Sequence, residues 1–140
     1  MSKILFKNKS LTIIFYEEKN YLFLKWTGFI PSEDFKTFAN QILIAIAQTK
    51  TQAILSDNTN WNVINPNDHA WAANHWFPDA EKKGVRKLAT ILSQDYLNRA
   101  AEKNIEGMAE VNCMQIQNFN TYEESIRWLR TEETLSSFCN

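Results

Sequence analysis

The sequence predicts a single α/β domain: a mostly parallel sheet that begins with an antiparallel hairpin and is flanked by helices. Two β-rich runs, 11–16 and 21–26, are separated by only four residues, which is typical of a hairpin. Strand and helix patterns then alternate, and such alternation gives parallel strands joined by right-handed crossovers. No linker, repeat or low-complexity stretch interrupts residues 1–140, so we expect one domain with a core over 11–130 and a short tail over 131–140.

Composition supports a packed interior and argues against a nucleic-acid partner. The chain has 140 residues, of which 44% are hydrophobic and 13% aromatic, enough to bury a core of its own. The formal net charge is only -1, so no overall positive field attracts a polyanion. Short basic clusters such as Lys82–Lys83 and Arg86–Lys87 alternate with acidic residues, and we interpret them as solvated mixed-charge surface.

The sequence also predicts a location. The first residues lack the apolar stretch of a signal peptide, and no run approaches the ~18 apolar residues of a membrane span. We therefore expect no membrane insertion and a cytoplasmic protein. Cys113 and Cys139 do not have a paired spacing, which favours two unpaired thiols in a reducing compartment over a disulfide scaffold or a zinc site.

The first half of the chain predicts two or three strands and a helix. Residues 3–6 are a candidate short strand ahead of the hairpin, in which Leu22, Leu24 and Trp26 share one face. Ser32 is a suitable N-cap for the following helix, with acidic residues in the first turn. Its apolar residues recur at helical spacing and predict one buried stripe. The stripe comprises Phe35, Phe38, Ala39, Ile42, Leu43 and Ile46.

The stretch 52–78 organises the rest of the fold. The apolar run 53–55 predicts a central strand that ends at Ser56–Asp57 and continues into an Asn-rich loop over 58–64. Asn65 then serves as the N-cap of a helix that starts at Pro66, with Asp68 in the first turn. Because ligands of open α/β sheets bind where strands end, we expect this stretch to form the working surface.

The helix after Pro66 contains more aromatic side chains than one buried stripe can accept. Trp71, Trp76 and Phe77 point in three directions at about 100° per residue. A compact inward stripe is already supplied by Ala70, Ala73, Phe77 and Ala80. We therefore expect Trp71 and His75 to lie beside that stripe at the surface.

Two breakers and two histidines complete this helix. Pro78 should kink or restart it, and Gly84 should close it as a C-terminal cap. His69 and His75 are six residues apart, about 240° around a helix, so they cannot both face one metal ion. We expect no metal or cofactor, and an ordinary structural role remains the favoured interpretation of both histidines.

The later elements repeat the strand and helix alternation. Residues 85–93 predict a second strand that, like the apolar run 53–55, is buried on both faces. Ile54 and Leu55 in the first run and Leu88 and Ile91 in the second should therefore be almost fully buried. A helix should run from the turn at Gln94–Asp95 to Asn104, and a loop should cover 107–110. This helix should direct Leu97, Ala100 and Ala101 inward. Residues 112–119 predict an edge strand, and Thr121–Glu124 a capping box for a last helix docked by Ile126 and Leu129.

Two segments carry a resemblance to a known family: Trp76-Phe77-Pro78 followed by residues 84–89, and residues 119–129. With the order of elements, they resemble the STAS domain of bacterial anti-sigma-factor antagonists, and more closely its STAS/Sec14-type (SpoIIAA-like) subfamily. The resemblance covers roughly residues 11–129 and implies a regulatory scaffold. In the phospho-switched antagonists a Ser-containing run opens the helix after the third strand. Here that entry is Asn65–Asp68, without a hydroxyl, which puts the switch in doubt.

Acidic residues follow two predicted strands. Asp57 and Asp95 fall at the carboxyl ends of parallel strands and, with Ser56, mark a strand-end crevice. They are either an acid–base pair or caps for the helices that follow. Capping is the favoured interpretation, because no nucleophile with its own base accompanies them.

Three functions compete. The leading hypothesis is a non-catalytic regulatory or protein-binding module that presents a polar and aromatic surface to a protein partner or a second copy of itself, because Trp side chains anchor interfaces. That surface comprises Trp61, Asn65, Asp68, Trp71, His75 and Trp76. The alternative is a carrier or sensor of a small apolar ligand, and an enzyme is third. Rings exposed side by side favour a partner, whereas rings converging on a cavity favour a ligand.

Overall fold

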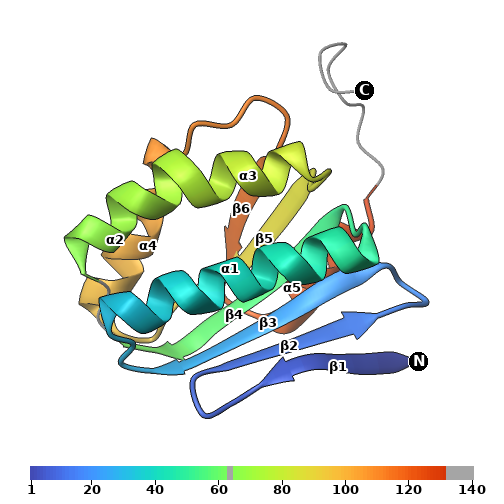
Figure 1. Ribbon diagram of the computed structural model, residues 1–140, viewed down its shortest axis with the longest axis horizontal. Coiled ribbons are helices and arrows are strands. Elements are labelled where there is room, and N and C mark those ends of the chain that lie inside the picture. Colours follow the sequence, from blue (N-terminus) through green and yellow to red (C-terminus); the bar gives the residue numbers. More distant parts are fainter. Residues whose placement is uncertain (63–64, 132–140) are drawn as a thin grey trace.

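A six-stranded sheet forms the centre of the molecule (Figure 1). The computed structural model describes residues 1–62 and 65–131. The strands follow one another across the sheet in chain order, the first three antiparallel and the last four parallel. They are β1 (Ser2–Lys7), β2 (Leu11–Tyr16), β3 (Tyr21–Gly28), β4 (Ala53–Trp61), β5 (Lys87–Ile91) and β6 (Gln115–Phe119). The predicted fold class is confirmed.

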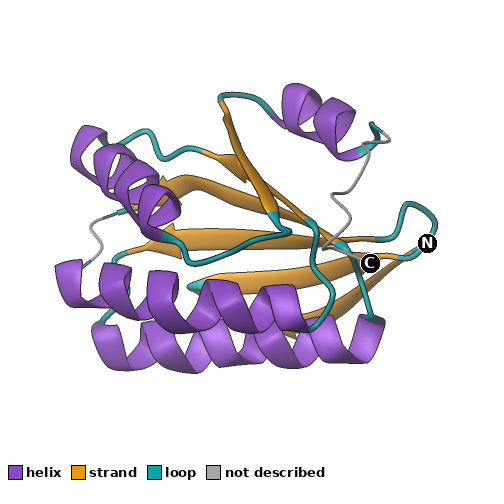
Figure 2. Cartoon of the chain, turned by 90° about the horizontal axis from the view of Figure 1, so that it is seen from above, coloured by secondary structure: helices purple, strands orange, loops and turns teal. Residues whose placement is uncertain are grey.

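Helices cover both faces of this sheet (Figure 2). Two long helical rods lie on one face: α1 (Ser32–Thr49), and the run of α2 (Pro66–Trp71), η1 (Ala72–Trp76) and α3 (Phe77–Lys82). The opposite face is covered by α5 (Tyr122–Leu129). The remaining helix, α4 (Tyr96–Met108), packs against α2 and η1 at one end of the strands.

The central strands are buried on both sides, as their apolar runs predict. Successive side chains of a strand point to opposite faces, so Ile54 joins the core beneath α1 while Leu55 joins the core beneath α5. Ile54 and Leu55 are 0% exposed, and Leu88 and Ile91 are each 4% exposed. The predicted burial of all four residues is confirmed.

Several local signals also hold. Asn65 caps α2 by accepting a hydrogen bond from the Asn67 N–H at 2.8 Å, and the hydroxyl of Thr121 caps α5 at the Glu124 N–H. Gly84, at φ +106°, follows the last turn of α3. The N-cap of α1 is Pro31 and not Ser32, one residue earlier than predicted.

The prediction of a loop over 58–64 is wrong for its first four residues, because β4 continues to Trp61. The backbone of Asn60 and Trp61 pairs with Thr27 and Gly28 of β3, and this ladder outweighs the low strand propensity of asparagine. Val63 and Ile64 lie outside the described residues.

The predicted inward face of α4 is also wrong for two of its three residues, and the third, Ala101, is only half-buried. Leu97 is 70% exposed and Ala100 is exposed, whereas Asn98 and Glu102 are buried. Asp95 fixes the start of the helix by accepting a hydrogen bond from the Asn98 N–H at 2.9 Å, and the helix then turns a mostly polar face inward. The helix also continues to Met108, past the loop predicted to begin at residue 107.

Pro78 perturbs the long helix as predicted, although the helix does not stop. Proline cannot donate to the carbonyl four residues earlier, and the turn before it is a π-helix in which the Phe77 N–H donates to the Ala72 carbonyl. The wider turn rotates each residue by less than an α-helix does. Together with packing against α1 and α4, it lets Trp76 and Phe77 both face the interior.

Cys113 is disulfide-bonded, so the prediction of an unpaired thiol there is wrong. Cys139 lies outside the described residues. Over the part of the chain that the structure describes, no helix combines the length and the apolar character needed to cross a bilayer. A cytoplasmic location stays a prediction, and the disulfide removes one of its arguments.

The buried strand gives a matched stability test. Leu88→Ala should lower the free energy of unfolding by roughly 2 to 5 kcal/mol, because it leaves a cavity between the sheet and the helices. Leu97→Ala, on the exposed face of α4, should lower it by less than about 0.5 kcal/mol. Chemical denaturation of both variants checks this, and equal losses would contradict the assignment of the two positions.

Candidate functional site

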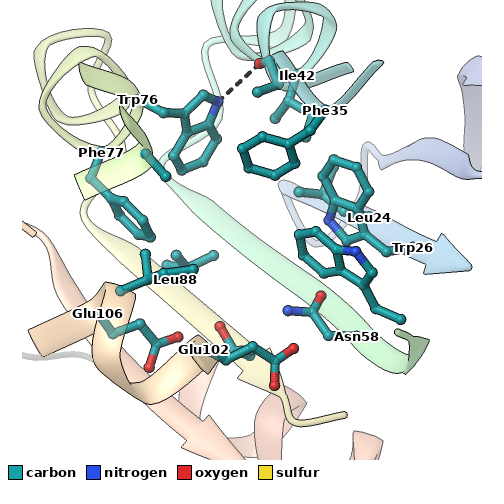
Figure 3. A pocket seen from close by; sticks show the side chains of 15 residues that line it. Leu24, Trp26, Phe35, Ile42, Asn58, Trp76, Phe77, Leu88, Glu102 and Glu106 are labelled. Carbon is teal, nitrogen blue, oxygen red and sulfur yellow. Dashed lines mark hydrogen bonds between the residues drawn. The ribbon is translucent and has the colours of Figure 1, made fainter. Parts of the chain in front are cut away.

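A cavity of about 80 Å³ lies between the parallel strands and the helices α1, η1 and α4 (Figure 3). Its wall combines aromatic and aliphatic side chains with a polar edge. The lining residues are Leu24, Trp26, Phe35, Ala39, Ile42, Asn58, Trp61, Ala72, Trp76, Phe77, Leu88, Thr90, Glu102, Ile105 and Glu106. Apolar walls with a few polar groups at one side are typical of small-molecule sites, and this partly open cavity is smaller than most of them.

The aromatic part of the wall is held by ring packing and one hydrogen bond. Trp26 and Trp61 stack with ring centroids 4.4 Å apart, and Phe35 packs against both at 5.8 to 5.9 Å. The indole Nε1 of Trp76 donates a 2.9 Å hydrogen bond to the backbone carbonyl of Ala39 in α1. These contacts fix the rings before any ligand arrives, which lowers the entropic cost of binding.

The polar edge follows from strand register. On the face toward α4, Ile54, Leu88 and Ile116 lie side by side across β4, β5 and β6. Two residues further along the same strands, and therefore on the same face, stand Ser56, Thr90 and Asn118. The sheet surface thus changes from apolar to polar toward the carboxyl ends of its strands.

Two carboxyl groups from α4 stand over this polar row. Glu102 and Glu106 are one helical turn apart, and both side chains point toward the cavity in Figure 3. Glu102 is 3% exposed; its Oε2 accepts a 3.0 Å hydrogen bond from the Ser93 N–H. Its Oε1 has no hydrogen-bond partner within the described residues.

Burial raises the pKa of both carboxyls to about 7. For Glu102, the Ser93 N–H and the Asn58 side chain oppose this rise in pKa, while the neighbouring Glu106 adds to it. For Glu106, the side chains of Thr90 and Asn118 oppose it. With both pKa values raised to about 7, each carboxyl is partly protonated near neutral pH.

The aromatic residues predicted at the surface divide into two groups. Trp61 and Trp76 are buried, at 6% and 7% exposure, and both line the cavity, which is the arrangement expected of a ligand site and not of a flat interface. Trp71 is half-buried and packs edge-on against Phe35, with ring centroids 6.1 Å apart. His75 is exposed beside it.

The polar residues of the predicted binding surface, Asn65 and Asp68, also differ in exposure. Asn65 is exposed and caps α2, whereas Asp68 is buried at 2% exposure and cannot contact a partner. Within residues 1–62 and 65–131, no group of three or more His, Cys, Asp or Glu side chains is placed to hold a metal ion.

The predicted crevice is not one site. Ser56 is buried toward α4 and donates a 2.7 Å hydrogen bond to Asn58 Oδ1, while Asp57 points to the opposite face. Asp57 accepts hydrogen bonds from the backbone and hydroxyl of Thr59 within β4, and the N-cap of the next helix is Asn65, so the capping interpretation is wrong for Asp57. Asp95 caps α4, as the capping interpretation predicts.

Neither Glu102 nor Glu106 was predicted as a site residue. The usable signal is the replacement of apolar by polar residues along one face of three consecutive strands: Ile54 to Ser56, Leu88 to Thr90, and Ile116 to Asn118. A helix that crosses such a row must present polar side chains to it.

Comparison with known proteins supports the fold and no further property. No family model matches the chain, and no curated protein matches it. Solved structures do match it, among them an uncharacterized protein from the DUF3478 family with a SpoIIAA-like fold, from Shewanella loihica PV-4. The match has a TM-score of 0.50 and 19% sequence identity and covers 92% of each chain. The SpoIIAA-like fold implied by the sequence resemblance is confirmed.

The buried carboxyls should make stability fall as pH rises. A folded-state pKa of about 7 against a reference value of 4.5 means that the native state binds more protons than the unfolded state between these pH values. The stabilisation is complete below about pH 4.5 and is lost by about pH 7, roughly 3 kcal/mol for one isolated carboxyl.

Glu102→Gln should therefore flatten the dependence of unfolding free energy on pH between about pH 5 and pH 8 relative to the wild type. Glu110→Gln, at an exposed position just after the same helix, should leave it unchanged. Denaturant titrations across this pH range measure both variants. Equal slopes for the wild type and Glu102→Gln would contradict the buried position of this carboxyl.

Proposed function

We propose that this SpoIIAA-like module is a non-catalytic carrier or sensor that binds a small molecule in the cavity beside Glu102. The observation behind this proposal is that the buried rings of Trp26, Trp61 and Trp76 converge on one cavity and are not exposed side by side. That arrangement favours a ligand over a protein partner as the occupant of this surface.

The cavity limits the size of the ligand. An apolar cavity of about 150 Å³ accepts benzene, and the space here is about 80 Å³. A ligand that enters without rearrangement is therefore smaller than benzene. It contacts aromatic rings on one side and carboxyl and amide groups on the other, so we infer an amphiphilic ligand in place of the purely apolar one that the sequence suggests.

We further propose that any regulatory role works without the usual phosphoserine switch. The N-terminus of α2, Asn65–Asp68, offers no hydroxyl to a kinase. The nearest hydroxyls upstream are engaged: Ser56 is buried and bound to Asn58, and Thr59 donates to Asp57 within β4. Ligand occupancy is then the signal that this face reports.

A protein partner or a second copy of the chain is the second candidate, and it uses the part of the predicted surface that stays accessible. His75 is exposed, and its ring centroid lies 6.3 Å from that of the half-buried Trp71. The ammonium group of Lys36 lies 5.9 Å from the centre of the Trp71 ring. Aromatic side chains with a cationic neighbour are favoured in interface anchors.

Filling the cavity tests the first candidate. Ala39→Leu should place a larger side chain in the cavity and abolish binding of a small probe such as 1-butanol, followed by NMR shifts of the indole N–H groups of Trp61 and Trp76. Ala47→Leu, on the exposed face of the same helix α1, should bind like the wild type. Unchanged binding in Ala39→Leu would move the site away from this cavity.

Removing one ring tests the second candidate. Trp71→Ala should weaken association with a partner or a second copy, and because the ring is half-buried against Phe35 it should also cost about 1 to 2 kcal/mol of stability. His75→Ala removes an exposed neighbour and should weaken association at little cost in stability. Sedimentation and melting curves separate the two effects. Two results would contradict this candidate: association that neither variant weakens, and a wild-type chain that associates neither with itself nor with any captured protein.

A further inference from the structure

The proposed ligand site carries an electrostatic preference that the fold alone does not imply. Glu102 and Glu106 both line a cavity whose other walls are mainly apolar. Among the described lining residues there is no lysine, arginine or histidine to neutralise them. Buried carboxylates are normally paired with a cation or a metal, so a positive charge is missing from this set.

The nearest charged groups do not supply it. Arg99 of α4 donates its hydrogen bond to Asn120, away from the pair, and Lys103 is exposed. Each lowers the pKa of one glutamate only as a minor influence. Helix α2, which packs against α4, brings the buried Asp68 and His69, neither of which lines the cavity.

Hydrogen bonding identifies the missing group more closely. Glu102 Oε1 is buried, lines the cavity and has no donor within the described residues. An ammonium group is compact, carries a full charge and has three N–H donors. It can satisfy Glu102 Oε1 and reach Glu106 from one position, whereas an alcohol offers a single O–H and no charge.

The opposite wall suits the rest of such a ligand. The faces of Trp and Phe attract a cation and its polarised alkyl groups, and the wall across from the carboxyls consists of such rings. A volume of about 80 Å³ is below the roughly 150 Å³ that accepts the six carbon atoms of benzene, so the alkyl chain has at most about four carbon atoms beside the nitrogen.

We propose that the cavity selects small aliphatic ammonium ions, with the ammonium group between Glu102 and Glu106 and the alkyl chain against the rings of Trp26 and Phe35. This selectivity rests on the proposed function, because it names the chemical class of ligand for the same cavity. It differs from that function in requiring the charge of the two glutamates.

Three probes of nearly equal size isolate the charge: n-butylammonium, 1-butanol and butyrate. Each is titrated into the full chain at about pH 8 and constant ionic strength, with binding followed by the indole N–H signals of Trp61 and Trp76. Trp128, on α5 behind the opposite face of the sheet, serves as an internal control. We expect n-butylammonium to bind at least about tenfold more tightly than 1-butanol, and butyrate not to bind.

Two isosteric variants test the residues. Glu102→Gln and Glu106→Gln should each weaken n-butylammonium binding by about tenfold or more while leaving 1-butanol binding nearly unchanged, and Glu110→Gln should bind both probes like the wild type. Because 1-butanol binding reports an intact cavity, it separates lost selectivity from lost folding.

The outcomes distinguish the two proposals. Equal affinity for n-butylammonium and 1-butanol, or ammonium binding that survives both glutamine variants, overturns the selectivity and leaves a neutral ligand pocket. No binding of any probe overturns the selectivity and the ligand-binding function together, and the cavity is then a hydrated part of the core.

Discussion

Two carboxyl groups that line a cavity without a lysine, arginine or histidine in its wall govern this end of the fold. An ionised carboxylate in an apolar interior is strongly unfavourable, so Glu102 and Glu106 can stay inside only with a raised pKa and with donors around them. The strand ends provide one hydrogen bond, from the Ser93 backbone N–H to Glu102, and the polar side chains of Asn58 and Thr90, which oppose the rise in pKa. The position of α4, its phase and the polar row beneath it are therefore parts of one arrangement.

The aromatic wall depends on the same geometry. Extension of β4 to Trp61 brings that ring onto Trp26, and the Ser93 hydroxyl donates a 2.7 Å hydrogen bond to the Trp61 carbonyl. Ser93 thus ties the end of β4 and the Glu102 carboxyl to one short segment after β5. Rings and acids face each other across the cavity because adjacent residues of the same strands and turns hold both.

Much of the fold follows from periodicity and capping. The hairpin, the helix after Pro31, the cap at Asn65 and the closing capping box are local signals, and each is found close to where the sequence predicts it. The site was less predictable, because its signals are not local. The row Ser56, Thr90 and Asn118 exists only once three strands are in register, and polar residues on the inward face of α4 make sense only above that row. The prediction that Leu97 and Ala100 face inward assumes an apolar sheet surface beneath α4, and the strand ends do not provide one.

The aromatic helix makes the same point about context. If this helix packed against the sheet alone, one buried stripe could not accommodate all of its rings. The helix also packs against α1 and α4, and the π turn before Pro78 widens it. Trp76 is therefore buried as well. A space remains where the aromatic rings, the strand ends and α4 meet. Apolar side chains at positions 102 and 106 would fill that space and remove two desolvated acids, which is commonly the more stable solution. Local rules are broken in this way mainly at functional sites, and this is the physical reason for proposing a ligand in the unfilled, acidic cavity.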